Sequence, residues 1–184
     1  FALECLLGFF ASRRIVTPTI PEDIRTAILM PAHNEEEVIA QTLESIKAQL
    51  GTQDEVVVVA DNCSDNTANI VREFGFTALE RQNDNERGKG FALDFGMQHL
   101  KAQESPPDIV IIIDADCLLG DDALTHLKHQ VIMEQRPAQA QYLMKRGDID
   151  RIAVKVSEFA FLVKNKIRLR GLDRMGMPVP LTGT

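Results

Sequence analysis

Short apolar runs alternate with stretches of helical periodicity along most of this chain. Four runs predict buried strands, at residues 27–31, 55–60, 76–81 and 108–113. Spacing of apolar residues and capping signals predict helices at residues 36–50, 64–74, 91–102 and 121–135. A further strand is expected at residues 138–145. This alternation predicts an α/β fold with a mostly parallel sheet covered by helices on both faces.

The first eleven residues, FALECLLGFFA, are apolar except for Glu4, and Arg13 and Arg14 follow closely. They predict either the last turns of a membrane helix with arginines at its cytoplasmic edge, or an amphipathic terminal helix packed on the domain. We expect residues 1–25 to form a membrane-proximal segment and linker, and residues 26–184 to form the folded domain. The chain begins with Phe and stops at LTGT, so we expect it to be a fragment of a longer protein.

Charge is distributed unevenly over the 184 residues, whose formal net charge is −7. Nine Lys/Arg and four Asp/Glu give residues 145–174 a charge of +5, so the rest carries −12. The acidic total argues against nucleic acid as a partner, because nucleic-acid binding requires a basic face. The three cysteines lie far apart without a CxxC motif, which favours a reducing compartment and argues against a disulfide framework or a structural zinc site.

Residues 152–172 combine basic side chains with six apolar positions at helical spacing. These are Ile152, Val156, Phe159, Ala160, Val163 and Ile167. We expect a helix that lies on an anionic membrane surface. The alternative is that the stripe packs on the domain while the charges face solvent.

Polar segments follow the predicted strands, at the edge where open α/β sheets bind ligands. They read PAHNEEE (31–37), DNCSDNT (61–67), RQNDNERGKG (81–90) and DADC (114–117). Acidic residues at three strand ends of one sheet predict a shared site. No GxxxxGK[ST] loop is present and no GxGxxG follows the first strand, which argues against a P-loop ATPase or a dinucleotide dehydrogenase.

Asp114 and Asp116 are the sharpest candidates for chemistry. At positions i and i+2 beyond a buried strand they are expected to share a face, where a hard cation such as Mg²⁺ or Mn²⁺ would relieve their repulsion. The alternative is a solvated turn. Lys89 opens a predicted helix between two glycines and suits an anion, unless this segment is a plain flexible turn. Asp61 could accept hydrogen bonds from a base or ribose, whereas His33 is not expected to act as a base.

Taken together, ILMPAHNEEEVI, VVVVADNCSDNT, ERGKGFAL and IVIIIDADC, in this order, resemble the nucleotide-sugar half of a family 2 glycosyltransferase. The resemblance covers residues 26–184. It is strongest to the processive, membrane-bound type, similar to cellulose and hyaluronan synthases and bacterial exopolysaccharide transferases. It implies a GT-A fold and an inverting, divalent-metal-dependent transfer of sugar from a nucleotide-sugar donor, with a UDP-sugar favoured. The implied acceptor is a polysaccharide or lipid-linked glycoconjugate at the cytoplasmic face of the cell membrane.

The resemblance also implies roles for individual residues. Pro31, Ala32, His33 and Glu35 would border the base and ribose, and Asp61 would bond the base. Lys89 would lie toward the diphosphate. Asp114 and Asp116 would be the family's DxD motif, with Asp116 the main ligand of Mg²⁺ or Mn²⁺.

One part of the family pattern is missing from residues 1–184. After the DADC segment, where the family pattern places them, neither the Glu-Asp motif that supplies the catalytic base nor the QxxRW segment occurs, so the base is expected beyond Thr184 and the fragment is expected to be inactive in transfer. Three alternatives remain: a nucleotidyltransferase, a non-catalytic nucleotide-binding domain, and transfer of a single sugar to a polyprenyl-phosphate lipid. The first is disfavoured, because PAHNEEE lacks the Gly-rich, Arg-containing loop it would need.

Overall fold

The computed structural model describes residues 2–8, 21, 23–143 and 152–177. The chain divides into two compact units, one of residues 18–136 and one that combines residues 1–17 with residues 137–184. Each unit is described by itself. None of the helices in the described part of the chain is both long and apolar enough to cross a membrane.

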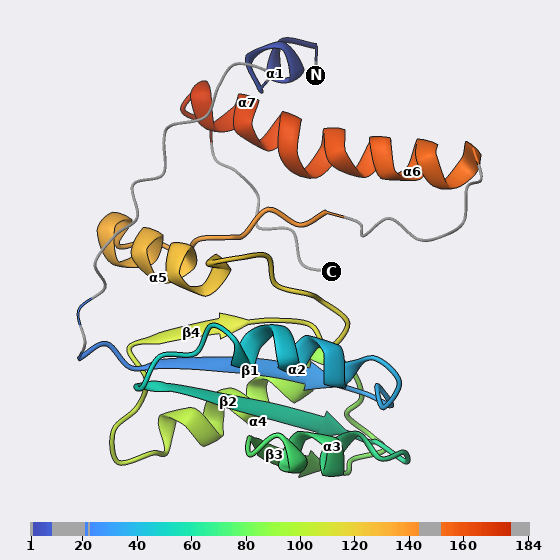
Figure 1. The fold of residues 1–184 in the computed structure, drawn as a ribbon, viewed down its shortest axis with the longest axis vertical. Coiled ribbons are helices and arrows are strands. Elements are labelled where there is room, and N and C mark those ends of the chain that lie inside the picture. The colour runs from blue at the N-terminus through green and yellow to red at the C-terminus, as the bar shows by residue number, and fades with distance from the viewer. Residues whose placement is uncertain (1, 9–20, 22, 144–151, 178–184) are drawn as a thin grey trace. The chain divides into compact units, whose positions relative to one another are not determined.

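The larger unit is built around a four-stranded sheet of order β3-β2-β1-β4 (Figure 1). The strands are β1 (Thr26–Ala32), β2 (Asp54–Asp61), β3 (Thr77–Arg81) and β4 (Ile109–Ile112), and every neighbouring pair is parallel. Parallel pairing requires crossovers, which are α2 (Ile39–Lys47), α3 (Thr67–Glu73) and α4 (Lys89–Lys101). The helix α5 (Ala123–Glu134) follows β4. The predicted fold class is therefore confirmed.

Two apolar layers cover the two faces of the sheet, as the near-continuous apolar strands require. On one face Ile28, Met30 and Val58 pack with Leu43 of α2 and Leu124 of α5. On the other face Leu29, Val57 and Val59 pack with Ala92 and Leu100 of α4. At Gly96 of α4, an added Cβ would lie 2.4 Å from Leu29 Cδ1, so a glycine is what lets this helix approach the sheet.

The strand expected at residues 138–145 is wrong for the part that the structure describes. Residues 137–143 form neither helix nor strand, and Met144 and Lys145 lie outside the described residues. The physical reason lies in the sequence: Pro137 lacks a backbone N–H donor, and Gln139 and Gln141 interrupt the apolar pattern that a buried strand needs.

The smaller unit contains α1 (Ala2–Gly8) and three consecutive helical segments, α6 (Ile152–Leu162), η1 (Val163–Arg168) and α7 (Leu169–Arg174). Close approach of α1 to α7 is possible because Gly171 has no side chain; a Cβ there would lie 1.8 Å from the Glu4 carbonyl oxygen. Arg168 Nε also donates to Glu4 Oε2 at 2.7 Å.

The apolar stripe predicted for residues 152–172 is exposed at its first end and buried toward its last. Ile167 is buried, whereas Ile152, Val156 and Phe159 are exposed. Part of the stripe thus packs within this unit, and the α6 part presents an apolar face.

Candidate functional site

The polar loops that follow β1, β2 and β4 lie at the carboxyl edge of the sheet. The chain proceeds from β1 to β2 and β3 on one side, and β4 lies on the other side of β1. Such a reversal of strand order opens a crevice beyond the strand ends, which is where α/β sheets bind ligands. The loop after β1, with His33 and Glu35, and the loop after β4, with Asp114 and Asp116, flank this point.

The loops after β1 and β2 are joined by hydrogen bonds. His33 Nδ1 lies 2.7 Å from the Asp61 carbonyl oxygen, and Glu35 N donates to Thr67 Oγ1 at 2.9 Å. Asn34 has a left-handed backbone (φ 56°), which asparagine tolerates, and its Oδ1 accepts from Ser64 N at 2.8 Å. A carbonyl oxygen only accepts, so the contact places the proton of a neutral His33 on Nδ1 and leaves Nε2 as an acceptor.

Glu35 is the residue of this loop whose ionisation is most affected by its surroundings. Partial burial raises the pKa of the Glu35 carboxyl group, and the negative charges of Asp116, Asp65 and Asp114 raise it further, against an opposing effect of His33. Pro31 is half-buried and Ala32 is part of the core.

Asp61, the last residue of β2, is buried in an ion pair that the sequence did not predict. Arg81 Nη1 donates to Asp61 Oδ1 at 2.7 Å and to the Glu86 carbonyl oxygen at 2.7 Å, and the Arg81 guanidinium lies over the Phe91 ring. Both members of the ion pair are buried. Arg81 thus holds the Asp61 carboxylate in place and anchors the loop that leads to Lys89. Arg81 lies directly opposite Asp61 in the register of β2 and β3, which becomes visible only in the folded sheet.

Asn62 follows Asp61 and also has a left-handed backbone (φ 52°). Its Oδ1 accepts from Asn83 N at 2.8 Å, which fixes the orientation of the amide. Among the described residues, Asn62 Nδ2 is a buried donor without a hydrogen-bond partner. A donor of this kind needs a partner such as a ligand or ordered water.

The carboxylate pair lies in a turn beyond β4, and the expected reason for its proximity is wrong. β4 ends at Ile112, so Asp114 and Asp116 are not successive positions on one face of a strand. Ala115 between them is buried, and its carbonyl oxygen accepts from Thr42 Oγ1 of α2 at 2.7 Å. This anchor to α2 shapes the turn, and sequence reasoning missed Thr42.

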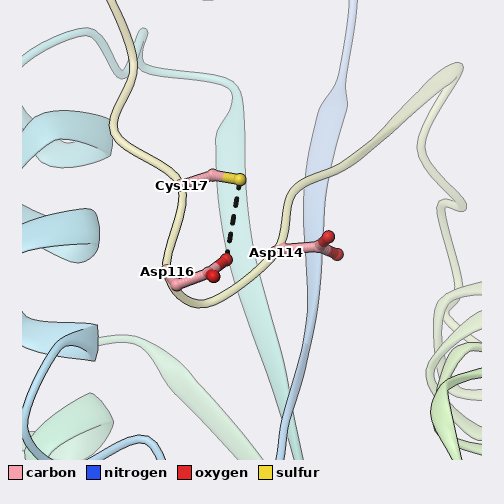
Figure 2. A group of neighbouring side chains, drawn as sticks. All are labelled: Asp114, Asp116 and Cys117. Carbon is pink, nitrogen blue, oxygen red and sulfur yellow. Dashed lines mark hydrogen bonds between the residues drawn. The ribbon is translucent and has the colours of Figure 1, made fainter. Parts of the chain in front are cut away.

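The turn nonetheless brings potential metal ligands together. One ligand atom each of Asp114, Asp116 and Cys117 lies within 4.8 Å of the other two. Figure 2 shows Asp116 and Cys117 facing one another, with the Asp114 carboxylate directed to a different side of the loop. Two carboxylates at this spacing fit a hard divalent cation such as Mg²⁺ or Mn²⁺, which prefers oxygen ligands.

Lys89, the first residue of α4, reaches the same turn. Its Nζ lies 2.6 Å from Asp114 Oδ1, and the two side chains are 38% and 20% exposed. Of the predicted site residues, the structure therefore joins Lys89 to Asp114, His33 to Asp61, and Glu35 electrostatically to the carboxylate pair.

Comparisons of this sequence with a family model and with known proteins agree on one family. The family model described as glycosyl transferase family 2 matches residues 27–150. The protein named "Probable glycosyltransferase YdaM" of Bacillus subtilis (strain 168) is 36% identical over 100 residues, and a poly-β-1,6-N-acetyl-D-glucosamine synthase of Staphylococcus epidermidis is 32% identical over 103 residues. These matches cover 50% and 53% of this chain and 23% of each relative, so the matched stretch spans about a quarter of the relatives' length.

A solved structure extends the likeness to the fold. The mannosyltransferase PcManGT from Pyrobaculum calidifontis, in complex with GDP-Man and Mn²⁺, matches with a TM-score of 0.53 at 21% identity. The match covers 98% of this chain and 56% of that one. At this identity the likeness shows the fold alone, which is the GT-A fold of glycosyltransferases.

Proposed function

Because the chain belongs to glycosyl transferase family 2, we propose that it forms the donor-binding part of an inverting, divalent-metal-dependent hexosyltransferase. The donor is a nucleoside diphosphate sugar, with a UDP-sugar favoured. The observation that carries this proposal is the meeting of Asp114, Asp116 and Lys89 beyond the carboxyl ends of β1 and β4. Acidic ligands beside a cationic helix start suit a diphosphate that shares a metal ion with the protein.

The loops after β1 and β2 are proposed to hold the nucleoside. His33 Nε2 offers an acceptor, and Asn62 Nδ2 offers a donor that lacks a partner among the described residues. Asp61 and the backbone of Pro31 and Ala32 are proposed to contact the nucleoside as well. The hydrogen bonds between the two loops preorganise these groups, which reduces the ordering that donor binding requires.

The carboxylate side is proposed to act on the leaving group. Asp116 and Asp114 fit a Mg²⁺ or Mn²⁺ ion, which when bound would stabilise negative charge on the departing nucleoside diphosphate. Lys89 and the backbone N–H groups at the start of α4 add positive potential for the same oxygens. In the same fold, PcManGT is seen with GDP-Man and Mn²⁺, which supports this use of the site.

We assign the general base for the acceptor hydroxyl to no residue described here, and propose that residues 1–184 bind the donor without transferring its sugar. After Cys117 the sequence has neither the Glu-Asp motif nor the QxxRW segment that the family pattern implies. The relative that makes poly-β-1,6-N-acetyl-D-glucosamine supports a processive enzyme with a polysaccharide acceptor for the whole protein.

The exposed face of α6 is proposed to lie on the cytoplasmic surface of the cell membrane. Ile152, Val156 and Phe159 form its apolar side, and Lys155 and Lys164 belong to the segment of charge +5. We expect flotation with anionic vesicles that weakens at high salt and with the double substitution Lys164→Glu and Lys166→Glu. Absence of flotation at low salt would contradict this placement and leave donor binding unaffected.

Donor binding itself is tested by calorimetric titration of the purified chain. UDP, GDP, UDP-glucose, UDP-N-acetylglucosamine and GDP-mannose are titrated separately, each with Mn²⁺ and with EDTA. We expect saturable binding of at least one nucleotide sugar and of its nucleoside diphosphate, stronger in Mn²⁺. If none of the five binds in Mn²⁺, the proposed function is wrong.

A further inference from the structure

Lys89 forms an ion pair with a carboxylate of the candidate metal site. Its ammonium group lies 2.6 Å from Asp114 Oδ1, one of the two carboxylates that fit a divalent metal. The pair joins the start of α4 to the turn after β4. With 38% and 20% of the side chains exposed, this pair lies in a setting that water and ligands reach. A partly exposed ion pair is weaker than a buried one and can be broken by a competing partner.

An ammonium group and a divalent cation compete for the same carboxylate. Coulomb repulsion between two positive charges a few Å apart is large even at an intermediate dielectric constant. A metal ion bound by Asp114 and Asp116 would therefore weaken the contact of Lys89 with Asp114. The lysine side chain is long and flexible and carries three N–H donors, so it can turn to another anion without movement of the backbone.

We propose that Lys89 exchanges between Asp114 and the donor diphosphate, and thereby makes the binding of metal and of nucleotide depend on each other. This inference rests on the proposed donor and metal site. Without nucleotide, metal binding must displace Lys89 from its carboxylate. With a diphosphate present, the displaced ammonium gains a new partner, so each ligand strengthens the other by the same factor.

The exchange predicts effects of opposite sign from one substitution. Lys89→Met keeps most of the length of the side chain and removes its charge. It is expected to tighten the binding of Mn²⁺ alone by about three- to tenfold, because the competing cation is gone. The same substitution is expected to weaken binding of UDP in Mn²⁺ by about tenfold or more, because the diphosphate loses a charged donor. A residue that only stabilises the fold would weaken both.

The experiment measures the dissociation constant of Mn²⁺ by electron paramagnetic resonance, without nucleotide and with saturating UDP or GDP. Three forms of the full chain are compared: wild type, Lys89→Met and Arg87→Met. Arg87 is the matched control, since it is a cation in the same loop that pairs with Asp84 and not with the carboxylate pair. A fourth form, Lys89→Arg, keeps the charge and is expected to retain part of the competition.

Without nucleotide, Lys89→Met is expected to bind Mn²⁺ more tightly than wild type, and Arg87→Met is not. UDP or GDP is also expected to increase the Mn²⁺ affinity of Lys89→Met less than that of wild type. Unchanged or weaker Mn²⁺ binding in Lys89→Met would overturn the exchange. An equal gain in Arg87→Met would also overturn it, because the effect would then be one of general charge. If wild type binds nucleotide in Mn²⁺ while Lys89→Met shows no gain, the exchange fails and the donor site stands.

Discussion

Two ion pairs between an aspartate of the sheet region and a lysine on a helix lie at opposite edges of the sheet. At the amino edge, Lys128 Nζ of α5 contacts both carboxylate oxygens of Asp54, at 2.6 Å from Oδ1, and only 9% and 2% of these side chains are exposed. At the carboxyl edge, Lys89 contacts Asp114 at a similar distance, but 38% and 20% are exposed. Both pairs join a lysine ammonium group to an aspartate carboxylate, and they differ in how deeply the two side chains are buried.

That difference separates a structural contact from an exchangeable one. Asp54 also accepts from the Gly51 N–H at 2.7 Å, so it is enclosed by partners where β2 begins. A buried pair is costly to break because the remaining charge stays out of water. An exposed pair can be replaced by solvent or by a ligand at little cost. The Lys128–Asp54 pair is therefore fixed in place, whereas the Lys89–Asp114 pair can be replaced by a ligand.

The largest effect is expected from breaking the buried pair. Lys128→Met leaves the Asp54 carboxylate buried without a cation and should lower the free energy of unfolding by about 3–5 kcal/mol. The matched substitution Lys89→Met should lower it by less than about 1 kcal/mol. Urea unfolding followed by circular dichroism measures both. Equal losses in the two variants would contradict the distinction between the edges.

A smaller effect is expected at Asp61, where a buried pair lies at the binding edge. Asp61→Asn keeps the shape of the side chain but weakens its bond to Arg81, which should cost about 1–3 kcal/mol of stability. It should also weaken UDP binding by about tenfold while Mn²⁺ still strengthens it, because Asp61 is proposed to act on the nucleoside. Calorimetry in Mn²⁺ and in EDTA tests this, and a lost response to Mn²⁺ would show that Asp61 belongs to the metal site.

The smallest effect concerns the pH dependence set by Glu35. Since the pKa of Glu35 is raised in the folded chain, the folded state binds more protons between the ordinary glutamate pKa and the raised value. This group's contribution to stability is therefore fully present below the ordinary pKa and is lost as pH rises through the raised one. Glu35→Gln should make unfolding less pH-dependent in that window, and an unchanged profile in urea unfolding at a series of pH values would argue against it.

Prediction from sequence succeeded where the pattern was local. The apolar runs predicted all four strands of the sheet, and within the polar segments after them Lys89 contacts Asp114 and His33 contacts Asp61. Asp114 and Asp116 lie close together, but in a turn anchored by Thr42 and with their carboxylates directed to different sides of it, not on one face of a strand as expected.

What escaped prediction depends on contacts between distant segments. Nothing in the local sequence around Arg81 shows that it is buried against Asp61, twenty residues earlier in the chain. The pairing of Lys89 with Asp114 likewise exists only once α4 and β4 are assembled. Helix and strand periodicity describes one element at a time, so partners across elements become visible only in the folded structure.

The central claim is that a nucleoside diphosphate binds at the carboxyl edge through a metal ion held by Asp116. The most direct test is calorimetric titration of UDP and of GDP into wild type and Asp116→Ala, each in Mn²⁺ and in EDTA. Wild type should bind at least one of them more tightly in Mn²⁺, by about tenfold or more, and Asp116→Ala should lose most of that gain while its affinity in EDTA stays the same. Equal affinities in Mn²⁺ and EDTA for both proteins would contradict the claim.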